Sequence, residues 1–207
     1  TKVLLGEMNT AGVKKIVFSS SAATYGQPDS SRVTESAQCA PTNPYGESKL
    51  AIERELSTAA LNQGVAAVSL RYFNVAGALQ TNRGWLSERH DPETHLIPNV
   101  LRSTKDKPVE IYGTDWPTQD GTCIRDYVHV SDVAEAHINA ANYLLEGNKS
   151  IIMNLGTNRG HSILEMITAL EQITNQKVTY TVNPRRSGDA DSLVADTTIA
   201  KEVLKYS

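Results

Sequence analysis

The feature that most constrains this chain is the alternation of short apolar runs with segments of helical periodicity. Residues 15–19 and 65–71 are short apolar runs, whereas residues 2–12 and 44–63 carry apolar side chains at helical spacing. Strands that alternate with helices in this way fold into a mainly parallel sheet with helices packed on it. We therefore expect an α/β protein.

The second half of the chain continues the alternation in shorter segments. Ser162 and Glu165 form a capping box that should open a helix reaching about residue 173. The stretch 76–98 has no periodicity, so we expect a long loop of the kind that often carries function. The other expected elements are strands at 109–112, 126–130, 151–155 and 178–181, a helix at 131–145 capped by Ser131, and a last helix capped by Asp196.

A Tyr-x-x-x-Lys pair opens one of the expected helices. This helix should be capped by Asn43 and end at Gly64. Tyr45 and Lys49 lie four positions apart and share one helix face, and the helix dipole favours a negative charge near Tyr45. Taken alone, such a pair more often marks a solvated helix face than a catalytic site.

Three serines change the interpretation of this pair. Ser19, Ser20 and Ser21 end the strand that precedes the helix, and open α/β sheets bind ligands at the carboxyl ends of their strands. A serine at a strand end followed by Tyr-x-x-x-Lys is similar to the catalytic arrangement of the short-chain dehydrogenase/reductase superfamily.

Several motifs in order make the resemblance more specific, and they cover essentially the whole chain. Together they resemble the UDP-galactose 4-epimerases of the extended short-chain dehydrogenase/reductase family. Dehydratases of that family usually carry Thr-Asp-Glu where this chain has Ser20-Ser21-Ala22, which argues against dehydration. The motifs are FSSSAATYG at 18–26, PYGESK at 44–49, LRYFN at 70–74, DGT at 120–122, RDYVHV at 125–130 and PRRSGD at 184–189.

The resemblance implies a Rossmann-like parallel sheet with a smaller mixed α/β substrate-binding domain. Residues 1–75 would be the C-terminal part of the NAD-binding domain. Residues 76–207 would mainly bind the UDP-sugar, with segments around 126–155 returning to the first domain. The family's Gly-x-x-Gly-x-x-Gly loop, which binds the NAD pyrophosphate, does not occur in the sequence. We therefore expect a C-terminal part, lacking several βαβ units of ~30 residues each, that binds NAD poorly and is weak or inactive alone.

The resemblance also assigns catalytic and cofactor-binding residues. Ser21 would touch the sugar 4-hydroxyl, Tyr45 would be the acid/base, and Lys49 would stabilise its tyrosinate form. The implied reaction is NAD-dependent 4-epimerisation of a UDP-hexose through a 4-keto intermediate. The expected NAD contacts are Ser19, Ser21, Tyr45, Lys49, Tyr72 and Phe73.

The expected substrate contacts are spread over the rest of the chain. Arginines suit pyrophosphate because a planar guanidinium pairs well with phosphate oxygens. His95 stands where the family usually has Asn, and Leu193 is intermediate between the Tyr and the small residues that set hexose pocket width. The contacts are Ser21, Asn74, His95, Leu96, Glu110, Tyr112, Arg125, Arg186, Asp189 and Leu193.

Charge and composition narrow the partners. The formal net charge is −3 and Lys and Arg form no basic stripe, so we expect no nucleic acid partner. No apolar run has the length of a membrane span, so we expect no membrane partner. The two cysteines, Cys39 and Cys123, suit a reducing cytoplasm. The resemblance implies a homodimer.

A crowded group precedes the expected contact at His95. His90, Asp91, Glu93 and His95 lie close in sequence, but their spacing matches no established ligand pattern, so we expect no metal. Three alternatives to a UDP-galactose 4-epimerase stay open. They are an epimerase of another UDP-sugar (an N-acetylhexosamine, a pentose or a uronate), a sugar dehydratase or reductase, and a non-catalytic nucleotide-sugar-binding fragment.

Overall fold

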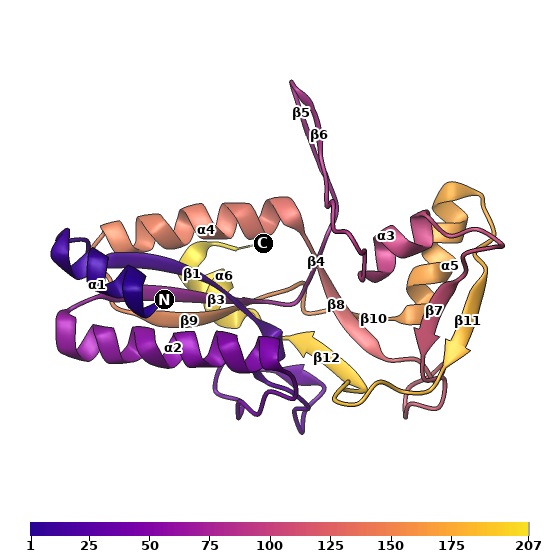
Figure 1. Cartoon of the computed structure of the whole chain (residues 1–207), viewed down its shortest axis with the longest axis horizontal. Coiled ribbons are helices and arrows are strands. Elements are labelled where there is room, and N and C mark those ends of the chain that lie inside the picture. Colours follow the sequence, from indigo (N-terminus) through magenta and orange to yellow (C-terminus); the bar gives the residue numbers. More distant parts are fainter. Residues whose placement is uncertain (207) are drawn as a thin grey trace.

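A three-stranded parallel sheet forms the centre of the larger part of the molecule (Figure 1). The structure is a computed structural model that describes residues 1–206. The sheet order is β1-β3-β9, and its strands are parallel to each other. The strands are β1 (Lys15–Ser21), β3 (Ala66–Tyr72) and β9 (Ile151–Leu155). This arrangement confirms the expected α/β class.

Helices cover both faces of this sheet. They are α1 (Lys2–Thr10) and α2 (Pro44–Gln63) on one face and α4 (Val130–Leu145) and α6 (Thr198–Leu204) on the other. Side chains of β1 alternate between the two cores: Phe18 packs toward α1 and α2, and Val17 toward α4 and α6. In Figure 1, α2 and α4 lie on opposite sides of the strands.

The helix ends follow the sequence signals for α2 and α5 and differ from them for α4 and α6. The Asn43 side chain accepts a hydrogen bond from the Gly46 N–H, and Gly64 ends α2 in the left-handed conformation at φ 65°. The expected capping box of Ser162 opens α5 (Ile163–Thr174). However, His129, not Ser131, is the N-cap of α4, and Thr197, not Asp196, is the N-cap of α6 (Thr198–Leu204). Since β8 continues to His129, α4 begins directly at the strand end.

A second sheet joins distant parts of the chain. Its order is β10-β8-β12-β2, with β4 also paired to β8. We did not expect β2, β10 or β12 from the sequence, because their short runs are held by partners far away in the chain. The strands are β2 (Arg32–Val33), β4 (Asn74–Ala76), β8 (Ile124–His129), β10 (Gly160–Ser162) and β12 (Ser192–Ala195).

A smaller lobe lies at the right of Figure 1. Its strands β7 (Val109–Tyr112) and β11 (Tyr180–Asn183) pair in parallel. Helices α3 (Leu96–Leu101) and α5 pack with β7 around Val100 and Ile167. The division of the chain into two domains near residue 75 stays a prediction.

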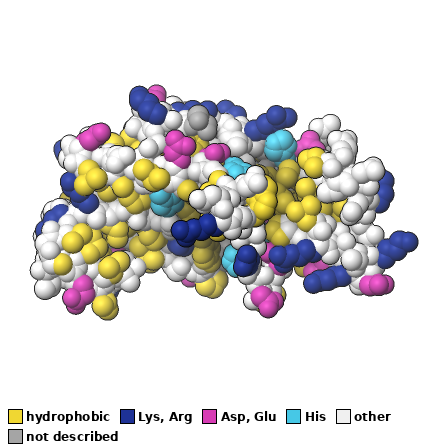
Figure 2. All heavy atoms as spheres, turned by 90° about the horizontal axis from the view of Figure 1, so that it is seen from above, with side chains coloured by type: hydrophobic (Ala, Val, Ile, Leu, Met, Phe, Trp, Pro, Cys, Tyr) yellow, Lys and Arg dark blue, Asp and Glu magenta, His cyan; other side chains and the backbone are white. Residues whose placement is uncertain are grey.

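The stretch 76–98 is less irregular than we expected. It contains a hairpin of β5 (Leu79–Thr81) and β6 (Gly84–Leu86), which projects from the molecule in Figure 1. The short runs were missed because these strands pair only with each other. No helix among residues 1–206 has the length and apolarity needed to cross a membrane. On the face drawn in Figure 2, Lys and Arg side chains are dispersed.

Candidate active site

Ser21 lies at the carboxyl end of β1, where the chain turns into the 3-10 helix η1 (Ala22–Thr24). Its hydroxyl oxygen accepts a hydrogen bond of 3.1 Å from the Ala23 N–H. That bond fixes the side chain, while the hydroxyl proton stays available for a ligand. Ser21 is thus held in place at the sheet edge.

Tyr45 and Lys49 stand in the first turns of α2, next to this edge. The Lys49 ammonium donates to the Ser19 carbonyl oxygen at 3.0 Å and lies 5.3 Å from the centre of the Tyr45 ring. The Tyr45 side chain is half-exposed, so a ligand can reach its hydroxyl. The fold therefore brings Tyr45 and Lys49 to the strand end that carries the serines.

A cavity of about 210 Å³ opens beside Ser21. Arg125 lines this cavity: its Nη1 donates to the Ala190 carbonyl at 2.9 Å, and its Nη2 lies 3.7 Å from an Asp189 carboxylate oxygen. Strand pairing places Leu193 beside Arg125. The predicted site residues that line the cavity are Ser21, Tyr72, Phe73, Asn74, Arg125, Asp189 and Leu193.

A buried ion pair of Glu53 and Arg71 lies next to β1, the strand that ends in the three serines. Glu53 of α2 receives a hydrogen bond of 2.9 Å from Arg71 Nε and one of 2.5 Å from the Ser20 hydroxyl. The side chains of Arg71 and Glu53 are 4% and 3% exposed. Arg71 also lies over the ring of Tyr25, whose pKa burial raises to about 12. We did not expect Glu53 from the sequence; its signal was a carboxylate one turn beyond Lys49.

Three of the predicted UDP contacts, Glu110, Tyr112 and Arg186, form a separate cluster on the smaller lobe. The Tyr112 hydroxyl donates to Glu110 at 2.5 Å. The Arg186 guanidinium lies 3.7 Å from the centre of the Tyr112 ring, which is a cation–π contact. None of these three side chains lines the cavity beside Ser21.

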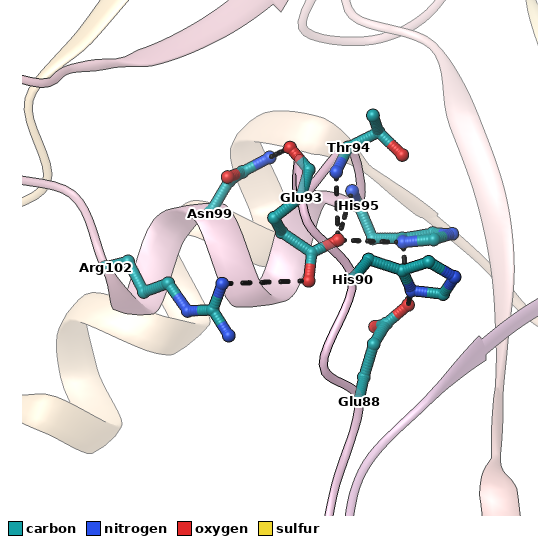
Figure 3. A network of polar contacts seen from close by, with 7 residues as sticks. All are labelled: Glu88, His90, Glu93, Thr94, His95, Asn99 and Arg102. Atoms are coloured by element: carbon teal, nitrogen blue, oxygen red, sulfur yellow. Dashed lines mark hydrogen bonds and ion pairs between the residues drawn. The ribbon is translucent and has the colours of Figure 1, made fainter.

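The polar group before α3 is a network of hydrogen bonds (Figure 3). Glu88 lies 2.6 Å from His90 Nδ1 and 2.8 Å from His95 Nδ1, and Glu93 lies 2.9 Å from His95 Nδ1. These are hydrogen-bond lengths, whereas the ligands of a tetrahedral zinc are about 3.3 Å apart. Bonds from the His95 main chain and ring lower the pKa of Glu93 to about 2. Glu88 takes part in the group and Asp91 does not.

Neither His95 nor Leu96 lines the cavity beside Ser21. His95 is the N-cap of α3, and its side chain is about half-exposed. Leu96 packs partly against the core of the smaller lobe. Their contact with a nucleotide stays a prediction.

One polar residue beside the site was not expected. His137 of α4 lies 2.8 Å from the Ser19 hydroxyl through Nε2. Its signal in the sequence was a histidine four residues after Val133 and three before Ala140, on the buried face of the expected helix.

Comparison with known proteins gives the site its context. Residues 1–156 match the NAD dependent epimerase/dehydratase family. The chain belongs to this family. It is 48% identical over 205 residues to the UDP-glucose 4-epimerase of Lacticaseibacillus casei, covering 98% of this chain and 61% of that relative. The chain thus spans about three fifths of the length of the relatives it matches.

Solved structures of the family show the same fold. The UDP-glucose 4-epimerase of Brucella ovis in complex with NAD superposes with a TM-score of 0.92 at 41% identity, over 100% of this chain and 63% of the other. The Bifidobacterium longum enzyme in complex with NAD+ and UDP gives 0.86 at 36% identity, over 99% and 62%. Both are Rossmann-like epimerases, which confirms the expected fold.

Proposed function

We propose that the protein containing this chain catalyses NAD-dependent 4-epimerisation of a UDP-hexose, UDP-galactose or UDP-glucose. The observation that carries the proposal is the placement of Tyr45 and Lys49 beside the serine strand end, next to a cavity lined by Ser21 and Arg125. The relatives named above are UDP-glucose 4-epimerases, which supports the assignment.

The residues at the sheet edge fit the nicotinamide end of NAD. The Lys49 ammonium has three donors, and among residues 1–206 only the Ser19 carbonyl accepts from it, which leaves donors for a ribose. Phe73 supplies a buried apolar wall. Bound NAD would supply the acceptor for the hydride from C4 of the sugar and the donor for its return. We propose Ser19, Ser21, Tyr45, Lys49, Tyr72 and Phe73 as the residues that hold it.

The chain's own groups would handle the proton and the orientation of the sugar. Ser21 holds the 4-hydroxyl, and Tyr45 as tyrosinate removes its proton. The positive charge of Lys49 stabilises the tyrosinate. The 4-keto sugar would rotate while its UDP stays bound, so that the hydride would return to the opposite face of C4 and Tyr45 would return the proton to the C4 oxygen. Free rotation of the sugar requires few fixed contacts at the hexose, so most of the binding groups should hold the UDP.

The UDP contacts are proposed on the same basis. Arg125 and Arg186 suit the pyrophosphate, Asp189 suits the ribose, and Glu110 and Tyr112 suit the uracil. Asn74, His95 and Leu96 complete the set, and we propose Leu193 as a contact of the hexose. We also propose a cytoplasmic homodimer in which α2 contributes to the interface.

The test is direct assay of the protein expressed from its complete gene. Incubation with UDP-galactose, followed by NMR of the sugar protons, should show UDP-glucose accumulating to an equilibrium mixture. Release of a 4-keto product would identify a dehydratase instead. If none of the UDP-sugars tested is turned over, the protein only binds nucleotide sugars and the proposal is overturned.

A substrate panel separates the epimerases from one another. UDP-N-acetylgalactosamine, a UDP-pentose and a UDP-uronate should be compared with UDP-galactose. Because Leu193 lines the cavity, Leu193→Tyr should reduce turnover of the N-acetylated sugar more than turnover of UDP-galactose. Faster turnover of a pentose or uronate than of the hexose would reassign the substrate.

A further inference from the structure

The turn at residues 186–189, which carries two of the proposed UDP contacts, is joined by hydrogen bonds to the loop that precedes α2. The Thr42 hydroxyl of this loop donates a hydrogen bond of 3.0 Å to the Gly188 carbonyl oxygen. The Gln27 side-chain amide donates one of 2.7 Å to the Asp189 carbonyl oxygen. Two side chains of the loop therefore hold consecutive carbonyl groups of the turn.

The main chain at Gly188 packs directly against Thr42. A Cβ atom added to Gly188 would lie 2.9 Å from Thr42 Oγ1 and 3.0 Å from Thr42 Cβ. The φ of Gly188 is 87°, which lies in the left-handed region that glycine adopts without strain. The glycine thus lets the turn approach Thr42 closely enough for the hydrogen bond to form.

The loop is a fixed support for the turn. Gly26 and Ala40 form a parallel β-bridge, and the Ala40 N–H donates to the Tyr25 carbonyl oxygen at 3.3 Å. Tyr25 is fully buried. At its other end the loop leads into α2, where the Asn43 side chain caps the helix that carries Tyr45. Because main-chain contacts and a helix cap hold the loop, it keeps a fixed spacing from the proposed acid/base.

The contact between loop and turn forms part of the wall of the cavity beside Ser21. Thr42, Gly188 and Asp189 all line this cavity. The Asp189 carboxylate lies 3.7 Å from Arg125 Nη2, and its side chain is 33% exposed. Since the loop holds Asp189 by its main chain, the carboxylate stays available to a ligand in the cavity.

We propose that Thr42 and Gln27 are positioning residues, which hold the turn 186–189 in the conformation that receives the UDP part of the substrate. The inference rests on the proposed function, which assigns Arg186 to the pyrophosphate and Asp189 to the ribose. A turn that is ordered before the ligand arrives loses less conformational entropy on binding, so the ligand binds more tightly. Loss of either side-chain bond therefore weakens UDP binding, while the proposed proton-transfer groups keep their places.

The test measures UDP binding by calorimetry and turnover of UDP-galactose, with the protein expressed from its complete gene. Thr42→Val removes the hydroxyl at nearly constant volume, and Gln27→Met removes the amide. We expect each variant to raise the Kd for UDP and the KM for UDP-galactose about threefold, as the loss of one hydrogen bond predicts, with kcat nearly unchanged. The double variant should raise both about tenfold, and Thr42→Ser, which keeps the hydroxyl, should bind UDP as wild type does.

Two further arms separate positioning from a general effect on the fold. Thr58→Val is the matched control, because the exposed Thr58 of α2 also donates to a main-chain carbonyl, that of Arg54, at 3.0 Å. Its Kd for UDP should equal that of wild type. In an Asp189→Asn background, Thr42→Val should weaken UDP binding less than it does in wild type, because residues that act through one another are not additive.

The remaining outcomes have defined meanings. If Thr42→Val and Gln27→Met bind UDP no more weakly than Thr58→Val does, the inference is overturned. Additive effects of Thr42→Val and Asp189→Asn also overturn it. A wild-type protein that binds UDP but turns over no UDP-sugar overturns the proposed function alone, because the Kd values still test the turn. A wild-type protein that does not bind UDP overturns both.

Discussion

The sheet edge and the smaller lobe carry polar groups of very different character. At the sheet edge, Glu53 and Arg71 are buried against each other below the serine strand. On the lobe, Tyr112 is half-buried while Glu110 and Arg186 are exposed, although these three groups also contact one another. Burial holds the cluster at the sheet edge in place. Solvent competes with the contacts that hold the cluster on the lobe.

This difference suits two different tasks. Groups that transfer a proton must stand in a fixed geometry before the substrate arrives, which a buried support provides. Groups that receive a flat base and a pyrophosphate must exchange their internal contacts for ligand contacts. The Arg186 guanidinium covers the Tyr112 ring, so uracil would have to replace it on that face. We therefore expect substitutions at the edge to change rate or stability, and substitutions on the lobe to change affinity.

The largest effect should follow from loss of the Tyr45 hydroxyl. Tyr45→Phe removes the proposed acid/base, and general acid–base catalysis contributes roughly 10²- to 10⁴-fold. Turnover of UDP-galactose should fall by about that factor, while UDP affinity measured by calorimetry stays within about twofold. Tyr180→Phe, at an exposed tyrosine of β11, is the control. Near-normal turnover in Tyr45→Phe would remove the acid/base assignment.

Loss of the buried ion pair between Glu53 and Arg71 should lower the free energy of unfolding. Glu53→Ala leaves the buried Arg71 without its carboxylate, and breaking such a pair costs about 3–5 kcal/mol. Chemical denaturation measures the loss. Glu55→Ala on the same helix breaks an ion pair with Lys2, whose side chain is 80% exposed, and should cost less than about 1 kcal/mol. Equal losses in the two variants would mean that the buried pair of Glu53 and Arg71 contributes no more to stability than the exposed pair of Glu55 and Lys2.

The same support predicts a loss of stability in alkaline solution. Burial raises the pKa of Tyr25 from 10.0 to about 12, so the folded state keeps a proton that the unfolded state releases. The neutral phenol thus contributes stability that is complete below about pH 10 and is lost as the pH rises to about 12. Urea denaturation between pH 9 and 12 should show this decline, and Tyr25→Phe should make it shallower. An unchanged slope in that variant would contradict the assignment.

The smallest effect should come from the lobe. Arg186→Ala should raise KM for UDP-galactose about tenfold, since one charge-assisted contact is worth about 1.5–3 kcal/mol, with kcat nearly unchanged. Arg185 is a matched control because it also stacks on an aromatic ring, that of Trp116, at 4.2 Å. Arg185→Ala should change KM less. A lower kcat at unchanged KM in Arg186→Ala would contradict the expectation that substitutions on the lobe change affinity, whereas substitutions at the sheet edge change rate or stability.

Local signals in the sequence predicted the local structure well. Asn43, Gly64 and the Ser162 capping box act through neighbours in the chain, and the structure has them as expected. The strands β2, β10 and β12 were not predicted, because their pairing partners lie far away in sequence. His137 was not predicted for the same reason. Its contact with Ser19 joins two elements, and the periodicity of one helix does not reveal such a contact.

Family motifs pointed to three proposed catalytic residues, and the structure adds the groups packed behind them. Ser21, Tyr45 and Lys49 were proposed from the sequence, and the fold brings them to one sheet edge. Glu53 and Arg71 were not proposed, since a buried ion pair leaves no local pattern beyond two charged residues. The placement of His95 and Leu96 away from the cavity shows that the motif alone did not define the geometry of the lobe.

The central claim is that C4 of the sugar is oxidised and reduced again within one binding event. The most direct measurement uses UDP-galactose deuterated at C4, with the protein expressed from its complete gene, and follows the label by NMR and mass spectrometry. Because the hydride is returned to the carbon that lost it, the UDP-glucose formed should keep its deuterium at C4. Loss of the label to solvent, or its transfer to another carbon, would contradict this account.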